Sequence, residues 1–143
     1  MSYSFPSEPW TAAFKDAINQ NPEYRKHGAP WTFGSVAMVV EANPSLGLEQ
    51  TAAIILDVHQ GSCQKATFVE GMEAVDVADP AFVIVADYAR WKLVVQGALD
   101  PIKGMMEGKL KLTKGHLPTM IRFVHSSRAL VTSAKDVPTE YLD

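Results

Sequence analysis

The sequence has little of what would place it in a membrane, on nucleic acid or in an oxidising compartment. Its one cysteine, Cys63, cannot form an internal disulfide, which agrees with a reducing compartment. The formal net charge is −3, so no general basic surface is expected and nucleic acid is not an expected partner. The longest apolar run, Ala81 to Ala86, is far shorter than the roughly 18–20 residues that a membrane-spanning helix needs, so no stable membrane insertion is expected.

The two ends of the sequence carry no recognisable targeting signal. The first ten residues have no cationic start and no apolar stretch behind it, unlike a secretory signal. The last three, Tyr141-Leu142-Asp143, are not a peroxisomal address of the Ser-Lys-Leu kind. We therefore expect a cytoplasmic protein.

Patterns that would support catalysis or metal binding are weak. His59 and Cys63 lie across a short turn, but none of the other histidines can be named as an orienting partner, and a lone cysteine in a strand is usually a small buried hydrophobe. The run Gly104 to Lys109 has the wrong glycine spacing for a phosphate loop, and Leu110 stands where Ser or Thr would bind magnesium. No paired His or Cys cluster exists. We expect no enzyme activity, no cofactor and no metal.

The composition is that of an ordinary globular protein. Hydrophobic residues make up 47% of the chain and charged residues 20%. A chain of 143 residues fits one domain with a real core, so we expect residues 1–143 to form a single domain.

The N-terminal half predicts a helix followed by strands. Residues 7–20 begin with Ser7 as an N-cap and Pro9 in the first turn, and Asn21-Pro22 ends this helix. Residues 23–27 add a short turn. Strands are expected at 33–42, 51–58 and 63–70, and the last two form a hairpin around residues 59–62, as in an antiparallel meander. Residues 70–80 are read as a solvated acidic loop.

The C-terminal half alternates short elements. A wholly apolar strand is expected at 81–86, then a helix capped by Asp87 that ends at Gly97. Asp100-Pro101 opens a short helix that stops at Gly108, and residues 109–113 alternate Lys and Leu as an edge strand does. The last helix, roughly residues 116–131, has an apolar arc of about half its circumference, which is more than one packing surface requires.

The stretch from Tyr88 to Leu130 resembles the sterol-binding domain of the sterol carrier protein family. The residues that carry the resemblance are a Trp on a helix before a Gly, an Asp-Pro helix start, a Met ahead of Gly-Lys-Leu-Lys-Leu, and a final helix with Met and Arg: Trp91, Gly97, Asp100, Pro101, Met106, Gly108–Leu112, Met120 and Arg122. The order of elements matches over most of the chain. The resemblance implies an α+β fold in which a five-stranded, mostly antiparallel sheet and about five helices enclose a hydrophobic tunnel for lipids.

Two departures limit what the resemblance implies about the ligand. The chain lacks the import tripeptide of peroxisomal members and so looks more like the free-standing prokaryotic-type domains. Where many members have Gly-Asn or Gly-Asp after the last strand, this chain has Gly115-His116-Leu117. Sterol itself is therefore not carried over as the ligand.

The function expected is non-catalytic binding and carriage of one long apolar molecule, such as a fatty acid, acyl-CoA, isoprenoid or sterol-like lipid. Burial of about sixteen methylenes offers on the order of 12 kcal/mol against association costs of about 4–15 kcal/mol, so micromolar binding needs no charge pair. The ligand-binding residues expected are apolar, with methionines that adapt to irregular shapes: Phe33, Trp91, Val94, Met105, Met106, Leu110, Leu112, Leu117, Met120, Ile121 and Val124.

Two further possibilities stay open. Polar head-group contacts could come from basic residues near the expected tunnel: Lys109, Lys111, Lys114 and Arg122. As an alternative function, the apolar final helix could make the chain a homodimer or an accessory module that docks on an acyl-metabolising enzyme.

Overall fold

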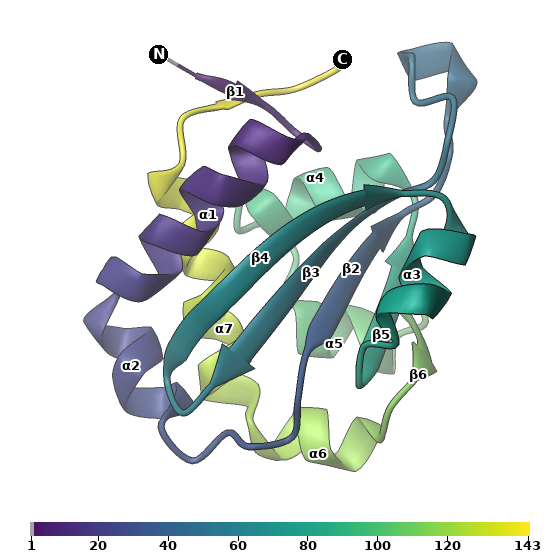
Figure 1. Ribbon diagram of the computed structural model, residues 1–143. Coiled ribbons are helices and arrows are strands. Elements are labelled where there is room, and N and C mark those ends of the chain that lie inside the picture. The colour runs from purple at the N-terminus through teal and green to yellow at the C-terminus, as the bar shows by residue number, and fades with distance from the viewer. Residues whose placement is uncertain (1) are drawn as a thin grey trace.

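The computed structural model describes residues 2–143 and is built on one five-stranded sheet (Figure 1). The strands are β2 (Val36–Val40), β3 (Ala52–His59), β4 (Ser62–Glu70), β5 (Phe82–Ala86) and β6 (Lys111–Lys114), in the spatial order β4-β3-β2-β5-β6. The β2–β5 pair is parallel and the other neighbouring pairs are antiparallel. The predicted α+β fold with a mostly antiparallel five-stranded sheet is confirmed.

The hairpin between β3 and β4 lies where the sequence predicts it. Gln60 and Gly61 both have positive φ, 48° and 86°, which is typical of the tight turns that match the twist of paired strands. A Cβ at Gly61 would lie 2.5 Å from the carbonyl oxygen of Arg25, so the close approach of α2 also favours glycine here.

Four helices begin at or next to the predicted residues: α1 (Glu8–Gln20), α2 (Pro22–Gly28), α4 (Tyr88–Val95) and α5 (Pro101–Met106). The predicted caps are present, since Ser7, Asp87 and Asp100 accept hydrogen bonds from backbone N–H groups in the first turns of α1, α4 and α5. These starts depend on local chemistry, which explains why the sequence predicts them well.

The predicted acidic loop at residues 70–80 is wrong in conformation, because it contains α3 (Met72–Ala78). Gly71 with φ 90° precedes the helix, and Asp79 with φ 50° follows it and pairs with Lys114 of β6. Val75 is the one buried residue of α3, and it belongs to the smaller cluster on the outer face of the sheet. The acidic side chains are exposed, as expected.

The predicted single helix over residues 116–131 is also wrong, because it is divided into α6 (Leu117–Arg122) and α7 (Val124–Thr132). Phe123 between them has φ −102° and ψ 34°. Its ring packs edge-on against Trp31 and Phe33, with ring centroids 5.1 Å and 5.6 Å apart. A tertiary aromatic contact therefore accompanies the break, where the sequence has neither glycine nor proline.

The remaining elements are short. They are two 3-10 helices, η1 (Pro44–Leu46) and η2 (Ser133–Asp136), and a two-stranded parallel sheet of β1 (Tyr3–Ser4) and β7 (Thr139–Glu140) that joins the two ends of the chain (Figure 1). With α3 and the divided last helix, residues 2–143 contain seven α-helices where about five were predicted. Within these residues, no helix combines the length and the apolar composition needed to cross a membrane.

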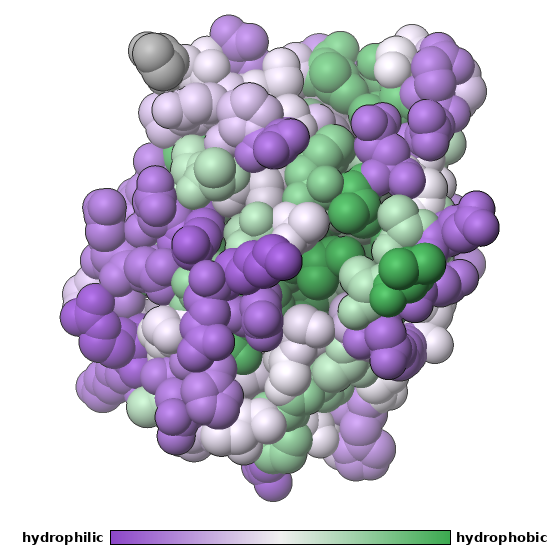
Figure 2. Space-filling view, in the orientation of Figure 1, coloured by the Kyte–Doolittle hydropathy of each residue, from purple (hydrophilic) through white to green (hydrophobic). Residues whose placement is uncertain are grey.

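The two faces of the sheet are covered unequally. Most helices enclose the larger core on the inner face, whereas α3 covers a smaller cluster on the outer face. Figure 2 shows the outer side, with polar side chains over α1 and α2 and apolar side chains gathered over the sheet and α3. Val77 of α3 is 82% exposed there.

Candidate functional site

A narrow apolar cavity lies between the inner face of the sheet and the C-terminal helices, with a volume of about 40 Å³. Its lining residues come from α2, the loop that follows, the three strands β2, β3 and β5, and the helices α4 to α7: Tyr24, Trp31, Val36, Met38, Val58, Ile84, Trp91, Pro101, Met120, Ser126, Ser127, Leu130 and Val131. Pockets that hold drug-sized ligands are typically about 300–1,000 Å³. A tunnel of acyl-chain size is therefore not shown, and the tunnel stays a prediction.

The middle of the sheet forms the floor of the cavity. Met38 of β2 pairs with Ile84 of β5, Val36 is two residues before Met38 on the same strand, and all three are buried. The indole N–H of Trp91 donates to the carbonyl oxygen of Val39 over 2.8 Å, which fixes α4 to the same strand. Trp91 is thus both a helix-to-sheet anchor and part of the cavity wall.

The cavity carries hydroxyl groups but no formal charge. Among its lining residues the polar side chains are Tyr24, Ser126 and Ser127. Burial raises the pKa of Tyr24, the nearby Cys63 raises it further, and a hydrogen bond with Ser126 opposes this. Tyr24 is therefore neutral over the physiological pH range, and the lining suits an apolar guest.

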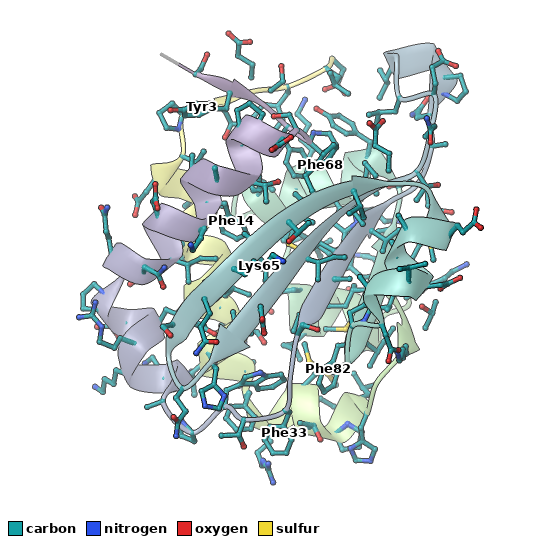
Figure 3. The ribbon with its side chains drawn as sticks, viewed as in Figure 1. Tyr3, Phe14, Phe33, Lys65, Phe68 and Phe82 are labelled. Carbon is teal, nitrogen blue, oxygen red and sulfur yellow. The ribbon has the colours of Figure 1, made fainter. Side chains whose placement is uncertain are left out.

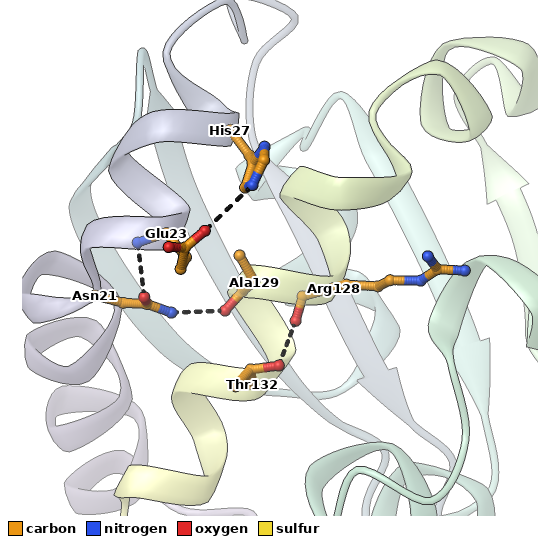
Figure 4. Close-up of polar contacts among 6 residues, drawn as sticks. All are labelled: Asn21, Glu23, His27, Arg128, Ala129 and Thr132. Atoms are coloured by element: carbon orange, nitrogen blue, oxygen red, sulfur yellow. Dashed lines mark hydrogen bonds and ion pairs between the residues drawn. The ribbon is translucent and has the colours of Figure 1, made fainter.

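Figure 4 shows polar contacts in the C-terminal half of α7, the helix over the cavity. The side-chain amide of Asn21 donates to the carbonyl oxygen of Ala129 and to the hydroxyl of Ser133, each over 3.0 Å. One residue before Ala129, Arg128 Nε donates to Asp100 Oδ2 over 2.7 Å. Near the other end, neither His116 nor Phe123 provides a side-chain cap for the helix that follows it.

Two of the predicted ligand-binding residues line this cavity, Trp91 and Met120. Three others are buried in the surrounding core, namely Val94, Met105 and Leu110. Leu112 and Leu117 are partly buried against that core.

The other four predicted residues lie away from the cavity. Met106, Ile121 and Val124 line an outer groove between α5 and the α6–α7 pair, where Met106 is 63% exposed. Phe33 is 40% exposed and lies at the end of the sheet near Phe82 (Figure 3). A ligand role for any of the eleven residues stays a prediction.

The cavity also has lining residues that the sequence reasoning missed. Val36, Met38, Val58 and Ile84 occupy the inner face of the strands, and the alternation of side chains along a strand could have identified them. Trp31 lies in an irregular loop, held by its indole N–H to the carbonyl oxygen of Gly34 over 2.9 Å. No periodic signal marks a residue of that kind.

The structure does not assemble His59 and Cys63 into a reactive pair. Cys63 pairs across the hairpin with Val58, its side chain is buried, and its thiol donates to the carbonyl oxygen of Lys65 over 3.3 Å. Burial raises the pKa of the Cys63 thiol to about 11, so the nucleophilic thiolate is scarce near neutral pH. Among residues 2–143, no cluster of three His, Cys, Asp or Glu side chains forms that could hold a metal ion.

Comparisons with known proteins agree with this fold. The sequence profile described as the SCP-2 sterol transfer family matches residues 14–120. A crystal structure of sterol carrier protein 2 is 34% identical, with a TM-score of 0.84 over 92% of this chain and 97% of that one. A solution structure from Thermus thermophilus, of a conserved hypothetical protein titled as possibly a sterol carrier protein, is also 34% identical, with a TM-score of 0.84 over 94% and 90% of the two chains.

A more distant structure shows the same fold alone. Sterol carrier protein 2 from Yarrowia lipolytica is 16% identical, with a TM-score of 0.55 over 92% of this chain and 94% of that one. The comparison with curated proteins gave no match. The matched profile covers most of the chain, from the middle of α1 to α6. The chain belongs to the SCP-2 sterol transfer family.

Proposed function

We propose that the protein binds one long apolar chain between the inner face of the sheet and α7, and carries it without reacting with it. The observation that supports this most directly is the narrow apolar cavity between the sheet and the C-terminal helices, whose lining residues carry no formal charge. Membership of a sterol transfer family favours a lipid as the guest.

Binding of a full acyl chain requires the cavity to widen. The helix α6 has one buried residue, Met120, and no side-chain cap at its start. Few buried contacts and unprotected ends are typical of segments that open at low free energy. Because Asn21 and Asp100 hold the middle and C-terminal end of α7, we expect α6 and the first turn of α7 to move outward while the rest stays in place.

The apolar energetics support useful affinity. Each buried methylene contributes roughly 0.8 kcal/mol, which for a long acyl chain exceeds the lower estimates of the association cost. Methionine side chains on opposite walls, Met38 and Met120, can repack around guests of different shape at small cost.

The test is a cavity-filling variant. Leu130 lines the cavity from α7, so we expect Leu130→Trp to weaken binding of a fluorescent fatty acid by at least about tenfold, as its indole occupies the widened space. Native mass spectrometry of protein purified without detergent shows whether a lipid is bound. Absence of any bound lipid and of saturable fatty-acid binding by the unmodified protein would contradict the proposal.

The matched control makes the same substitution away from the cavity. Leu93 on α4 is 43% exposed and does not line the cavity, so Leu93→Trp is expected to leave fatty-acid affinity within about twofold of the unmodified protein. Equal loss of affinity in both variants would mean that the cavity is not the binding site.

Two expectations from the sequence stay predictions of their own. A homodimer is tested by light scattering over a concentration series, and residence in the cytoplasm by imaging of the tagged protein in its own cell. Neither is needed for the binding proposed here.

A further inference from the structure

A second, open pocket adjoins the apolar cavity at the end of the molecule where α2 and the α6–α7 junction meet. We call it the end pocket, and its volume is about 410 Å³. Its lining residues include His27, Phe33, Arg122, Phe123, His125 and Ser126. Ser126 lines both the end pocket and the cavity, so the two spaces share a wall.

Arg122 holds a guanidinium group at this pocket without a matching anion. Its central carbon lies 5.2 Å from the ring centroids of both Phe33 and Phe123. Among residues 2–143 it has no carboxylate within ion-pair distance and no hydrogen-bond acceptor, whereas the next arginine in sequence, Arg128, is paired with Asp100. The aromatic contacts orient the group, and its N–H donors stay available.

Two imidazoles also line the end pocket. His27 of α2 and His125 of α7 have ring centroids 5.6 Å apart, with an angle of 35° between their planes. A neutral imidazole has one N–H and a protonated one has two. Nε2 of His27 lies 3.3 Å from the carboxylate of Glu23, whereas His125 has no carboxylate of residues 2–143 within ion-pair distance.

An aromatic path connects Arg122 to the cavity. The ring of Phe123 packs on Trp31 with centroids 5.1 Å apart, and Trp31 itself lines the cavity. A molecule with an anionic group beside Arg122 would therefore pass Phe123 and Trp31 before its apolar part reached the space under α7. This is the arrangement that an amphiphile with one chain and one compact head group fits.

We propose that the end pocket is the head-group site of the carrier and binds a compact anion, a carboxylate or phosphate, through Arg122 with help from His27 and His125. This inference rests on the proposed function, because the chain of the same ligand occupies the cavity. It predicts a preference for anionic single-chain lipids over neutral lipids of equal length.

The experiment compares hexadecanoate, hexadecyl phosphate and hexadecanol by titration against the unmodified protein, Arg122→Gln and Arg90→Gln. Arg90 is exposed on α4, outside the end pocket, so its variant controls for the lost charge. We expect Arg122→Gln to lower the affinity for at least one of the two anionic ligands by about tenfold or more. The affinity for hexadecanol should stay within about twofold. The anionic ligand whose affinity falls identifies the preferred head group.

The possible failures are distinguishable. If the unmodified protein binds hexadecanol as well as the anions, and Arg122→Gln changes none of the three, the head-group site is wrong and the carrier function stands. If Arg122→Gln weakens all three ligands equally, Arg122 supports the fold of the pocket and not the head group. If none of the ligands binds, the proposed function fails and this inference fails with it.

Discussion

The helices α1 and α7 contribute to the same core, but α1 buries larger side chains than α7 does. Trp10, Phe14 and Ile18 of α1 have no exposed surface (Figure 3 shows Phe14). Near its end, Asn19 donates to the carbonyl oxygen of Cys63 and accepts from its N–H, over 2.9 Å and 2.7 Å. In α7 only Ser126 and Ala129 are buried.

The difference divides one core into two sides. The side at α1 is filled by large side chains, and the side at α7, which we call the yielding side, contains the narrow cavity. On the α1 side, large rings pack on each other, with Trp10 and Phe14 centroids 4.8 Å apart. On the α7 side, the helix contributes two serines and two aliphatic side chains to the lining of the narrow cavity: Ser126, Ser127, Leu130 and Val131. A carrier needs both properties, because the filled side supplies the stability that lets the other side open.

The largest expected effect is the contrast between two core truncations. We expect Phe14→Ala to lower the free energy of unfolding by about 3–5 kcal/mol, whereas Met120→Ala costs about 2 kcal/mol because Met120 already faces a cavity. Urea denaturation measures both. As a control, Met106→Ala at a 63% exposed position is expected to stay within about 0.5 kcal/mol. Equal losses in the free energy of unfolding for Phe14→Ala and Met120→Ala would contradict the difference between the two sides of the core.

The next effect tests how well water is excluded from the core beside α1. The probe is Cys63, whose backbone is hydrogen-bonded to Asn19 of α1. The folded thiol has a pKa of about 11, above its ordinary value of 9.0, so the unfolded chain releases the proton first. Stability should therefore be unaffected by this group below about pH 9 and fall by on the order of 2 kcal/mol as the pH rises to about 11.

The comparison for this prediction is Cys63→Ala, measured by urea denaturation at several pH values. The variant should lose less stability than the unmodified protein between about pH 9 and 11, while Tyr24, whose pKa is also raised by burial, still contributes its own loss. Identical pH profiles of the two proteins would show that Cys63 is more hydrated than the structure indicates.

The smallest effect sharpens the description of how α7 is held. Asp100 accepts from the N–H of Ile102 as the cap of α5 and also pairs with Arg128 of α7, so Asp100→Ala should cost about 1–2 kcal/mol. Asp87→Ala removes a similar cap, on the N–H of Arg90, without a contact to α7 and should cost about 1 kcal/mol. Thermal unfolding gives both values, and a larger cost for Asp87 than for Asp100 would contradict the tether.

Much of the fold could be predicted from the sequence because its signals are local. Helix starts at Ser7, Asp87 and Asp100 depend on a cap within the next turn, and the β3–β4 hairpin depends on two turn residues. The break at Phe123 could not be predicted, because it coincides with packing on rings about ninety residues earlier in the chain.

The candidate site was predictable only in part, for a related reason. Trp91 and Met120 were identified from the family resemblance and the wide apolar arc, and both line the cavity, although their contact with a ligand stays a prediction. Met106 carries the same pattern but faces solvent, since helix periodicity identifies an apolar residue without fixing which neighbour it meets. Trp31 lies in an irregular loop, so its place in the cavity wall becomes visible only in the folded structure.

The yielding α7 side is tested most directly by hydrogen exchange with and without hexadecanoate. We predict that amides of α6 and the first turn of α7 exchange at lower free energy than those of α1, and that saturating hexadecanoate protects them while α1 is unchanged. Bound hexadecanoate that leaves α6 and α7 unprotected, or α6 amides as slow as those of α1 in the free protein, would contradict it.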